Sequence, residues 1–190
     1  HVYELDANTE SLENDMNPGE TWAVPIDIMN GGNGPDRYDM RVTSIADSNG
    51  LAQPWNVEIF RSDMSELQRD ENQTVMVHVE TPEQVGAGTY EVVLSIFSEE
   101  AWEGTRLRDV IQLTINVNEY HDMQLTLDPF VESSVKTTAP GRTIRFIMNL
   151  TNNGNVPDIP TLHNHTKKGD GNWDQEPGMN ALAGWATPHA

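Results

Sequence analysis

The amino-acid sequence predicts an all-β protein made of tandem antiparallel β-sandwiches, of which the second copy is incomplete. Three observations lead to this fold class. A long stretch of the chain repeats without a gap at an offset of 122 residues. Apolar residues alternate with polar ones over many short segments, as in strands with one buried face. No segment shows the periodicity of a convincing long helix.

The repeat pairs residues 18–36, PGETWAVPIDIMNGGNGPD, with residues 140–158, PGRTIRFIMNLTNNGNVPD. The Pro-Gly and Asn-x-Gly-Asn positions are identical, and the alternating apolar positions keep their character. The match extends upstream, where Leu5-Asp6 corresponds to Leu127-Asp128. A repeat of this length is a whole domain rather than a solenoid unit.

We therefore expect a complete sandwich over residues 1–118, a short linker over residues 119–122, and the start of a second sandwich over residues 123–190. The last strands of the second copy have no counterpart in the sequence. A half sandwich exposes a sheet face and unpaired strand edges, which favour aggregation. Two interpretations stay open: the segment is truncated, or a neighbouring chain supplies the missing strands.

The first copy contains seven predicted strands, each with apolar residues at every second position. They cover residues 1–6, 20–30, 36–45, 55–59, 74–80, 89–98 and 106–118. Asn8 to Asn17 is polar and is expected to be a loop, whereas Gly31 to Pro35 is a turn because Gly and Asn tolerate positive φ. Residues 61–71 are charged and have room for one helical turn. Pro25 faces outward, which suits an edge or a bulge better than a central position.

Alternation also predicts the core of the first copy. Trp22 and Trp55 lie on buried faces, and the other predicted core residues are Val75, Val77, Val79, Tyr90, Val92, Leu94, Ile96, Ile111, Leu113, Ile115 and Val117. The number and spacing of strands and turns suit an immunoglobulin-like topology. The Cys, Trp, Cys hallmark of antibody domains is missing, since the chain has no cysteine.

These turn and core residues resemble the NEW3 and CARDB-type immunoglobulin-like modules. The shared features are a Pro-Gly before the second strand, an Asn-x-Gly-Asn turn, a Trp-x-Val strand and a Pro…Ala-Gly-x-Tyr stretch, here Pro18-Gly19, Asn30 to Asn33, Trp55 to Val57 and Pro82 to Tyr90. The resemblance covers residues 18–118 well and 140–158 partly. It implies a spacer, surface-layer repeat or adhesion arm of archaeal or bacterial secreted proteins, sometimes appended to an enzyme. It implies no catalytic residues.

Composition limits the partners. The formal net charge is -19, from 30 Asp and Glu against 11 Lys and Arg. Such a surface repels nucleic acid and anionic membranes, and no stretch is long and apolar enough for a bilayer span. Without cysteine, no disulfide or thiolate metal site forms. We expect an extracellular or cell-surface location, with neighbouring copies of the chain or adjacent repeats as partners and glycans as further candidates.

Three N-glycosylation sequons begin at Asn72, Asn149 and Asn164. Asn149 should point to solvent, because it alternates with the apolar Met148 and Leu150. The alternative for all three positions is an ordinary polar residue that precedes Thr.

One loop resembles the start of a calcium site. Asp170, Asn172 and Asp174 place oxygen ligands at alternate positions, as in a tight loop around Ca²⁺. The Gly expected next is replaced by Gln175, and Ala181 stands where a closing Glu is expected. A polar loop without metal is therefore the alternative, and no cofactor is required. His163 and His165 share one side of a predicted strand, but no third metal ligand is evident.

No motif of an enzyme is present: there is no Gly-x-Ser-x-Gly, no His-Glu-x-x-His, no phosphate loop and no Cys nucleophile. The sequence therefore predicts a non-catalytic structural segment, such as a cell-surface stalk, a surface layer or a filament subunit. The alternative is a carbohydrate- or protein-binding accessory module of a secreted enzyme. In that case Trp102 and Trp173, both in predicted loops, would stack on a sugar or pack at an interface.

Overall fold

The computed structural model describes residues 2, 4–60, 66–100, 104–127, 137, 139, 142, 145–161, 165–167 and 173–175. These residues form twelve strands and no helix, so the predicted all-β class is confirmed. The chain divides into two compact units, unit 1 from His1 to Glu119 and unit 2 from Tyr120 to Ala190.

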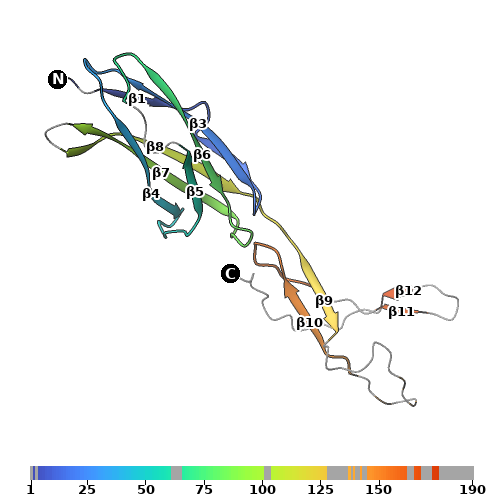
Figure 1. The fold of residues 1–190 in the computed structure, drawn as a ribbon. Coiled ribbons are helices and arrows are strands. Elements are labelled where there is room, and N and C mark those ends of the chain that lie inside the picture. The colour runs from blue at the N-terminus through green and yellow to red at the C-terminus, as the bar shows by residue number, and fades with distance from the viewer. Residues whose placement is uncertain are drawn as a thin grey trace. The chain divides into compact units, whose positions relative to one another are not determined.

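Unit 1 is a sandwich of two four-stranded sheets (Figure 1). The first sheet has the order β1-β3-β6-β5, with bounds Leu5–Asn8, Thr21–Asn30, Asn72–Glu80 and Asn56–Phe60. The second has the order β2-β8-β7-β4, with bounds Glu13–Met16, Gly104–Val117, Gly88–Glu100 and Tyr38–Asp47. The seven main strands follow the two-sheet arrangement of immunoglobulin-like domains, which confirms the predicted sandwich.

The core lies between these sheets. The residues predicted to face inward on β6, β7 and β8 are all buried, and so is Trp55, while Trp22 packs against the core half-buried. Trp55 and Tyr90 place their ring centroids 4.6 Å apart. The Tyr90 hydroxyl donates to the carbonyl of Gly86 at 2.8 Å. A tyrosine so placed near the start of this strand is the tyrosine corner of immunoglobulin-like sandwiches.

The loop predicted from Asn8 to Asn17 is wrong. β1 continues to Asn8, and β2 occupies Glu13–Met16, so unit 1 has eight strands rather than seven. β2 escapes sequence detection because it is an edge strand of four residues in which only Met16 is deeply buried. It also pairs in parallel with β8, whereas every other described pairing is antiparallel.

Pro25 is exposed on β3, as predicted. β1 pairs only with Asp27 to Asn30 of β3. At Pro25, β3 therefore has β6 on one side and no described strand on the other. A proline is tolerated there because a missing N–H on an open side removes no ladder hydrogen bond.

The described strands of unit 2 form two pairs. β9 (Met123–Leu127) pairs with β10 (Met148–Asn152), and β11 (His165–Lys167) pairs with β12 (Trp173–Gln175). Met123 faces Asn152 as Leu5 faces Asn30 in unit 1. Equivalent residues of β3 and β10 are thus 122 residues apart in the sequence (152 minus 30). Equivalent residues of β1 and β9 are only 118 residues apart (123 minus 5).

The predicted equivalence of Leu5 with Leu127 is therefore wrong, because the structural counterpart of Leu5 is Met123. The chain from β9 to β10 in unit 2 is therefore four residues longer than the chain from β1 to β3 in unit 1, which is the difference between the offsets of 122 and 118. An ungapped comparison misses this length difference.

Candidate interaction surfaces

A turn in unit 1 holds the chain segment that enters the unit. The Asn30 side chain shapes the turn: its Oδ1 accepts the Gly32 N–H at 2.9 Å and its Nδ2 donates to the Gly34 carbonyl at 2.9 Å. The turn then binds the entering backbone. The Asn33 N–H donates to the Val2 carbonyl at 3.0 Å, and the Val2 N–H donates to Asn33 Oδ1 at 2.9 Å. We name Asn30–Asn33 with its bound segment the entry clasp.

Unit 2 repeats the entry clasp. Asn152 Oδ1 accepts the Gly154 N–H at 2.9 Å, and the Asn155 N–H donates to the Tyr120 carbonyl at 2.9 Å. The Tyr120 N–H donates to Asn155 Oδ1 at 2.6 Å, and the Asn153 N–H donates to the Asp122 carbonyl at 2.8 Å. Val2 and Tyr120 are both held through their backbone N–H and carbonyl groups, so Tyr120 replaces Val2 without loss of a bond.

The glycine of each entry clasp is required by close approach. A Cβ on Gly32 would lie 2.7 Å from the Val2 carbonyl oxygen and 3.0 Å from Asn30 Oδ1. A Cβ on Gly154 would lie 2.9 Å from the Asp122 nitrogen and would collide with the Tyr120 carbonyl. The Asn-x-Gly-Asn motif is thus explained by backbone contact rather than by positive φ.

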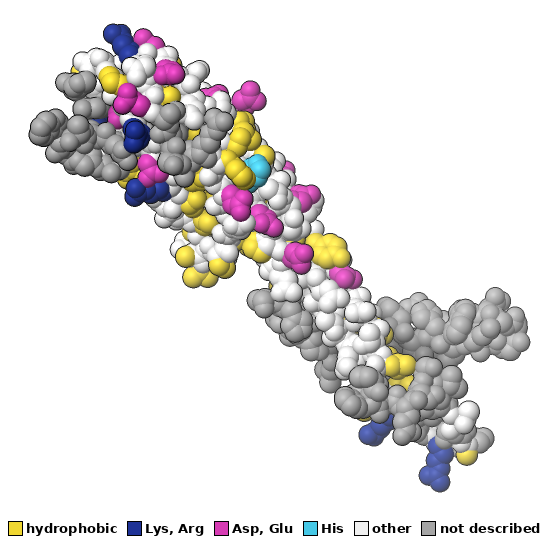
Figure 2. Space-filling model, viewed as in Figure 1, with side chains coloured by type: hydrophobic (Ala, Val, Ile, Leu, Met, Phe, Trp, Pro, Cys, Tyr) yellow, Lys and Arg dark blue, Asp and Glu magenta, His cyan; other side chains and the backbone are white. Residues whose placement is uncertain are grey.

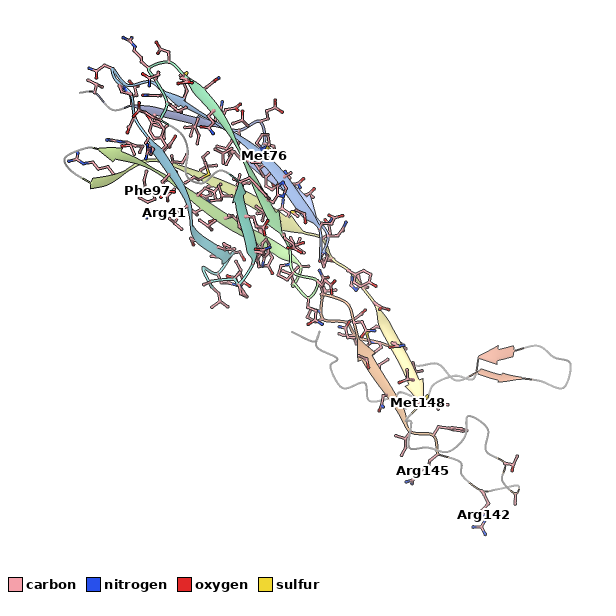
Figure 3. All side chains as sticks on the ribbon, in the orientation of Figure 1. Arg41, Met76, Phe97, Arg142, Arg145 and Met148 are labelled. Carbon is pink, nitrogen blue, oxygen red and sulfur yellow. The ribbon has the colours of Figure 1, made fainter. Side chains whose placement is uncertain are left out.

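An exposed apolar face distinguishes unit 2. Cross-strand pairs Leu125–Leu150 and Leu127–Met148 put these four side chains on one face of the β9–β10 pair. Leu125, Leu127 and Met148 are 47%, 37% and 48% exposed. Figure 3 labels Met148 at the start of β10. We name these four residues the β9–β10 apolar face.

The opposite face of the β9–β10 pair is polar. It carries the pairs Gln124–Thr151 and Thr126–Asn149. Asn149 is exposed, as predicted from alternation, and Asn72 is exposed at the start of β6. Asn164 lies outside the described residues. The use of these sequons stays a prediction, with two of the three asparagines accessible.

The predicted calcium loop falls largely outside the described residues, which exclude Asp170 and Asn172. Asp174 lies in β12, paired with Thr166 of β11. Across the part of the chain that the structure describes, no three His, Cys, Asp or Glu side chains are grouped to hold a metal ion. Calcium binding at residues 170–174 stays a prediction.

No helix among the described residues is long and apolar enough to cross a membrane.

The structure does not test the tryptophans proposed for ligand binding. Trp102 and His163 lie outside the described residues. Trp173 and His165 lie on β12 and β11, whose backbones pair. Sequence analysis placed Trp173 in a loop, so the strand at this position corrects that expectation.

Sequence analysis missed an apolar row on the outer face of the first sheet. Phe60 of β5 and Pro25 of β3 both pair with Met76 of β6, which Figure 3 labels. Phe60 is 46% exposed and meets His78 edge-on, with ring centroids 4.6 Å apart. Figure 2 shows hydrophobic side chains beside a histidine, with acidic side chains nearby. The sequence contained one sign of this row: Phe60 follows the inward-facing Ile59 directly, so alternation places its ring on the outer face.

Cations gather on the other sheet. Arg41 of β4 lies 5.2 Å above the Phe97 ring of β7, a cation–π contact, and its Nε donates to Asp39 at 2.5 Å (Figure 3). Arg108 Nε donates to the Ser98 hydroxyl at 2.6 Å. These contacts tie β4, β7 and β8 together, so they support the sheet rather than present a catalytic pair.

A buried phenol lies close to this cluster. Tyr38 is 1% exposed, and burial raises its pKa to about 12, helped by the negative charge of Asp36 and opposed by Arg108. Elsewhere in unit 1, a groove of about 290 Å³ separates the end of β1 from residues 109–112 of β8. Among the described residues that line this groove, Asp109 is the one titratable group.

Comparison with known proteins finds no matching family model and no matching curated protein. The resemblance to NEW3 and CARDB modules therefore stays a prediction. Similar solved structures include the ASH/PapD-like domain 7 of human CEP192, with TM-score 0.49, 14% identity and coverage of 62% of this chain and 87% of that one. A protein of unknown function from Porphyromonas gingivalis has TM-score 0.46, 14% identity and coverage of 85% and 71%. The Escherichia coli chaperone DraB has TM-score 0.40, 11% identity and coverage of 60% and 55%.

Proposed function

We propose that this chain is a non-catalytic structural segment of an extracellular protein built from immunoglobulin-like repeats, such as a cell-surface stalk, surface layer or filament subunit. Unit 1 acts as a spacer. Unit 2 is an assembly site, whose apolar face is covered by β-strands that a neighbouring copy of the chain provides.

The observation that carries this proposal is the contrast between equivalent residues. Ile26 of unit 1 has 0% exposure beneath the second sheet, whereas its counterpart Met148 is 48% exposed. The side chain facing Met148 across the strand pair, Leu127, is 37% exposed. A contiguous exposed apolar face of this kind marks a site of protein interaction.

Strand addition suits this face better than a small ligand. β9 and β10 are two strands with one apolar face, and an isolated two-stranded pair is marginally stable in water. Added strands would pair with the edges of β9 and β10 that face no described strand and would cover Leu125 and Leu150 at once. The polar face, with the sequon residue Asn149, would stay in solvent, so a glycan there would not block assembly.

The test is the oligomeric state of the 190-residue chain by light scattering and analytical ultracentrifugation. We expect assemblies that grow with protein concentration. Leu125→Glu should abolish them, because it puts a charge on the β9–β10 apolar face. Thr126→Glu is the matched control on the neighbouring residue, which faces the other way. A monomer at every concentration, or equal effects of both variants, would contradict the proposal.

A second arm of this experiment concerns calcium. Assembly that is lost in EDTA and restored by Ca²⁺ would make residues 170–174 part of the assembly site. Assembly that is unchanged in EDTA would leave these residues without a role in it.

A binding role is the second candidate, favoured by the outward Phe60 row of unit 1. An exposed aromatic ring beside apolar neighbours provides a surface on which a sugar ring or a partner side chain can stack. A glycan array probed with the wild-type chain and with Phe60→Ala distinguishes the two roles. Binding that Phe60→Ala removes supports an accessory module, whereas an array without signal counts against it.

A further inference from the structure

The second and last strands of unit 1, β2 and β8, meet in the only parallel pairing among the described strands. β2 and β8 run side by side with Glu13 opposite Thr114 and Met16 opposite Val117. The chain reaches β2 from β1 and leaves the unit after β8, toward β9 (Figure 1). Tension along the chain therefore pulls β2 by its first residue and β8 by its last.

We propose that the β2–β8 pairing is the force-bearing clamp of unit 1. In a parallel pair that is pulled from opposite ends, the strands can separate only by sliding past each other. All bonds between them then share the tension. In a pair that is pulled apart at one shared end, the bonds break one at a time. The inference rests on the proposed function, because a structural segment carries tension.

The bonds of the clamp suit resistance to sliding. The Thr114 N–H donates to the Leu12 carbonyl at 2.7 Å, and the Asn118 N–H donates to the Met16 carbonyl at 2.9 Å. The backbone of β2 is thus bound at both of its ends. The Met16 side chain is 1% exposed, so sliding also drags an apolar group out of the core.

Side chains add a second set of bonds. Asn116 Nδ2 donates to Glu13 Oε1 at 2.8 Å and to Asp15 Oδ1 at 3.1 Å. One amide on β8 thus joins two carboxylates that lie two residues apart on β2. Asn118 Nδ2 donates to Asn17 Oδ1 at 3.1 Å. A slip of one residue breaks all of these bonds, so they act together with the backbone pairing.

Apart from the entry clasp at Val2, no side-chain bond between described residues anchors β1 as Asn116 anchors β2. It pairs with β3 over four residues, and its inward side chains Leu5 and Ala7 are half-buried. Tension reaches β1 before β2, so β1 should detach first. The clamp then sets the force at which unit 1 unfolds.

Single-molecule force spectroscopy on the 190-residue chain tests the clamp. The chain has no cysteine, so thiol handles attach only where they are introduced. Glu10→Cys with Glu119→Cys pulls β2 and β8 from opposite ends. Pro18→Cys with Glu119→Cys pulls the same strands apart at their shared end. We expect a high-force peak in the first geometry and its loss in the second. Equal forces in both geometries would overturn the proposal.

A pair of matched variants identifies the bonds. Asn116→Ala removes the amide that bridges Glu13 and Asp15, together with the bond that Asn116 Oδ1 accepts from the Thr89 hydroxyl of β7. Asn56→Ala removes a similar exposed bond, from Asn56 Nδ2 to Glu80 Oε2 at 3.1 Å, on the other sheet. Urea unfolding of both variants measures their equilibrium stability. We expect Asn116→Ala alone to lower the unfolding force in the first geometry, and an equal loss of force in Asn56→Ala would contradict the clamp.

This outcome is separable from that of the proposed function. The pulling experiment is done on single molecules and does not depend on assembly. Assembly without a high-force peak would reject the clamp and leave the structural role in place. A high-force peak in a chain that never assembles would reject completion by a neighbouring copy instead.

Discussion

Units 1 and 2 differ in what covers the same two strands. In unit 1, Ile26 and Ile28 have 0% exposure, because a second four-stranded sheet lies over them. In unit 2, the counterparts Met148 and Leu150 lie on a face with exposed neighbours. The entry clasp, by contrast, repeats its bond to the turn glycine and its bonds to the entering backbone in both units. A local turn is thus specified by its own residues, whereas burial depends on strands far away in the sequence.

The largest expected effect comes from truncating equivalent core residues. Ile28→Ala should destabilise unit 1 by about 2–5 kcal/mol, as expected for a large apolar side chain removed from a packed core. Leu150→Ala should have a much smaller effect on the isolated chain, because Leu150 is only half-buried. Both stability losses are measured by urea unfolding that is monitored by amide hydrogen exchange, because exchange reports on each unit separately. Equal losses of stability from the two substitutions in the monomer would mean that the β9–β10 apolar face is already covered within the chain.

Substitution of the entry-clasp glycines, Gly32 and Gly154, tests the turn that units 1 and 2 share. Gly32→Ala and Gly154→Ala should each cost about 1–3 kcal/mol, since the added methyl group must displace backbone atoms. The loss should appear as faster exchange of the N–H groups that hold the entering segment, Asn33 in unit 1 and Asn155 in unit 2. Ala substitution at the exposed Gly50 is unsuitable as a control, because its φ of +78° adds strain. Unchanged exchange at Asn33 would show that the turn gives way without releasing Val2.

The extent to which sequence predicts this structure follows the same division between local and distant contacts. β3, β6 and β7 were predicted because the alternation at each spans at least seven residues, enough to define a buried face. β2 was not predicted, because a strand of four residues with one deeply buried side chain is too short to show an alternating pattern. The Asn-x-Gly-Asn turn was recognised, but its contact with Val2 and Tyr120 could not be, since the turn binds both residues through their backbones.

The candidate surfaces show a similar limit. Alternation indicated that Met148 and Leu150 share a face, yet nothing in the residues themselves says whether another sheet covers it. The row formed by Phe60 and Met76 depends on which strands are neighbours, and this order is known only from the pairing of β5 with β6. Strand adjacency is a property of the whole topology, so a single sequence fixes it weakly.

Alkaline pH should affect unit 1 in a way that unit 2 cannot share. Burial raises the pKa of Tyr38 to about 12 from an ordinary 10.0, while the residue at the same repeat position in unit 2 is Pro160. The folded state favours the protonated phenol, so this contribution is complete below pH 10 and is lost as the pH rises toward 12. The loss should reach about 2 kcal/mol.

Urea midpoints of unit 1 across this alkaline range measure the effect of Tyr38. Tyr38→Phe should fold normally, because the hydroxyl makes no hydrogen bond to any described residue. The variant should also lose much of the alkaline slope. A slope that is the same in Tyr38→Phe would assign the alkaline loss to other groups.

The smallest effect concerns the Pro-Gly turn that both units share. The Glu20 N–H donates to the Asn17 carbonyl at 3.2 Å, and the Arg142 N–H donates to the Ala139 carbonyl at the same distance. Among the described residues of the two turns, those of unit 1 add side-chain bonds, in which the Asn17 N–H and Nδ2 donate to the Glu20 carboxylate at 2.7 and 2.9 Å. The backbone bond, followed by the side-chain bond, lowers the pKa of Glu20.

Acid should therefore weaken this turn in unit 1 and leave its counterpart in unit 2 unaffected. A lowered folded-state pKa means that Glu20 contributes stability above its ordinary value of 4.5 and that this stability is lost as the pH falls through the folded-state pKa. The loss should be small because Glu20 is exposed. An NMR titration of the Glu20 carboxyl, with Glu20→Gln to identify its share of the acid limb, measures it. A carboxyl that titrates at its ordinary value would show that the two turns are equivalent in solution, and that the side-chain bonds add nothing to the backbone geometry both units already have.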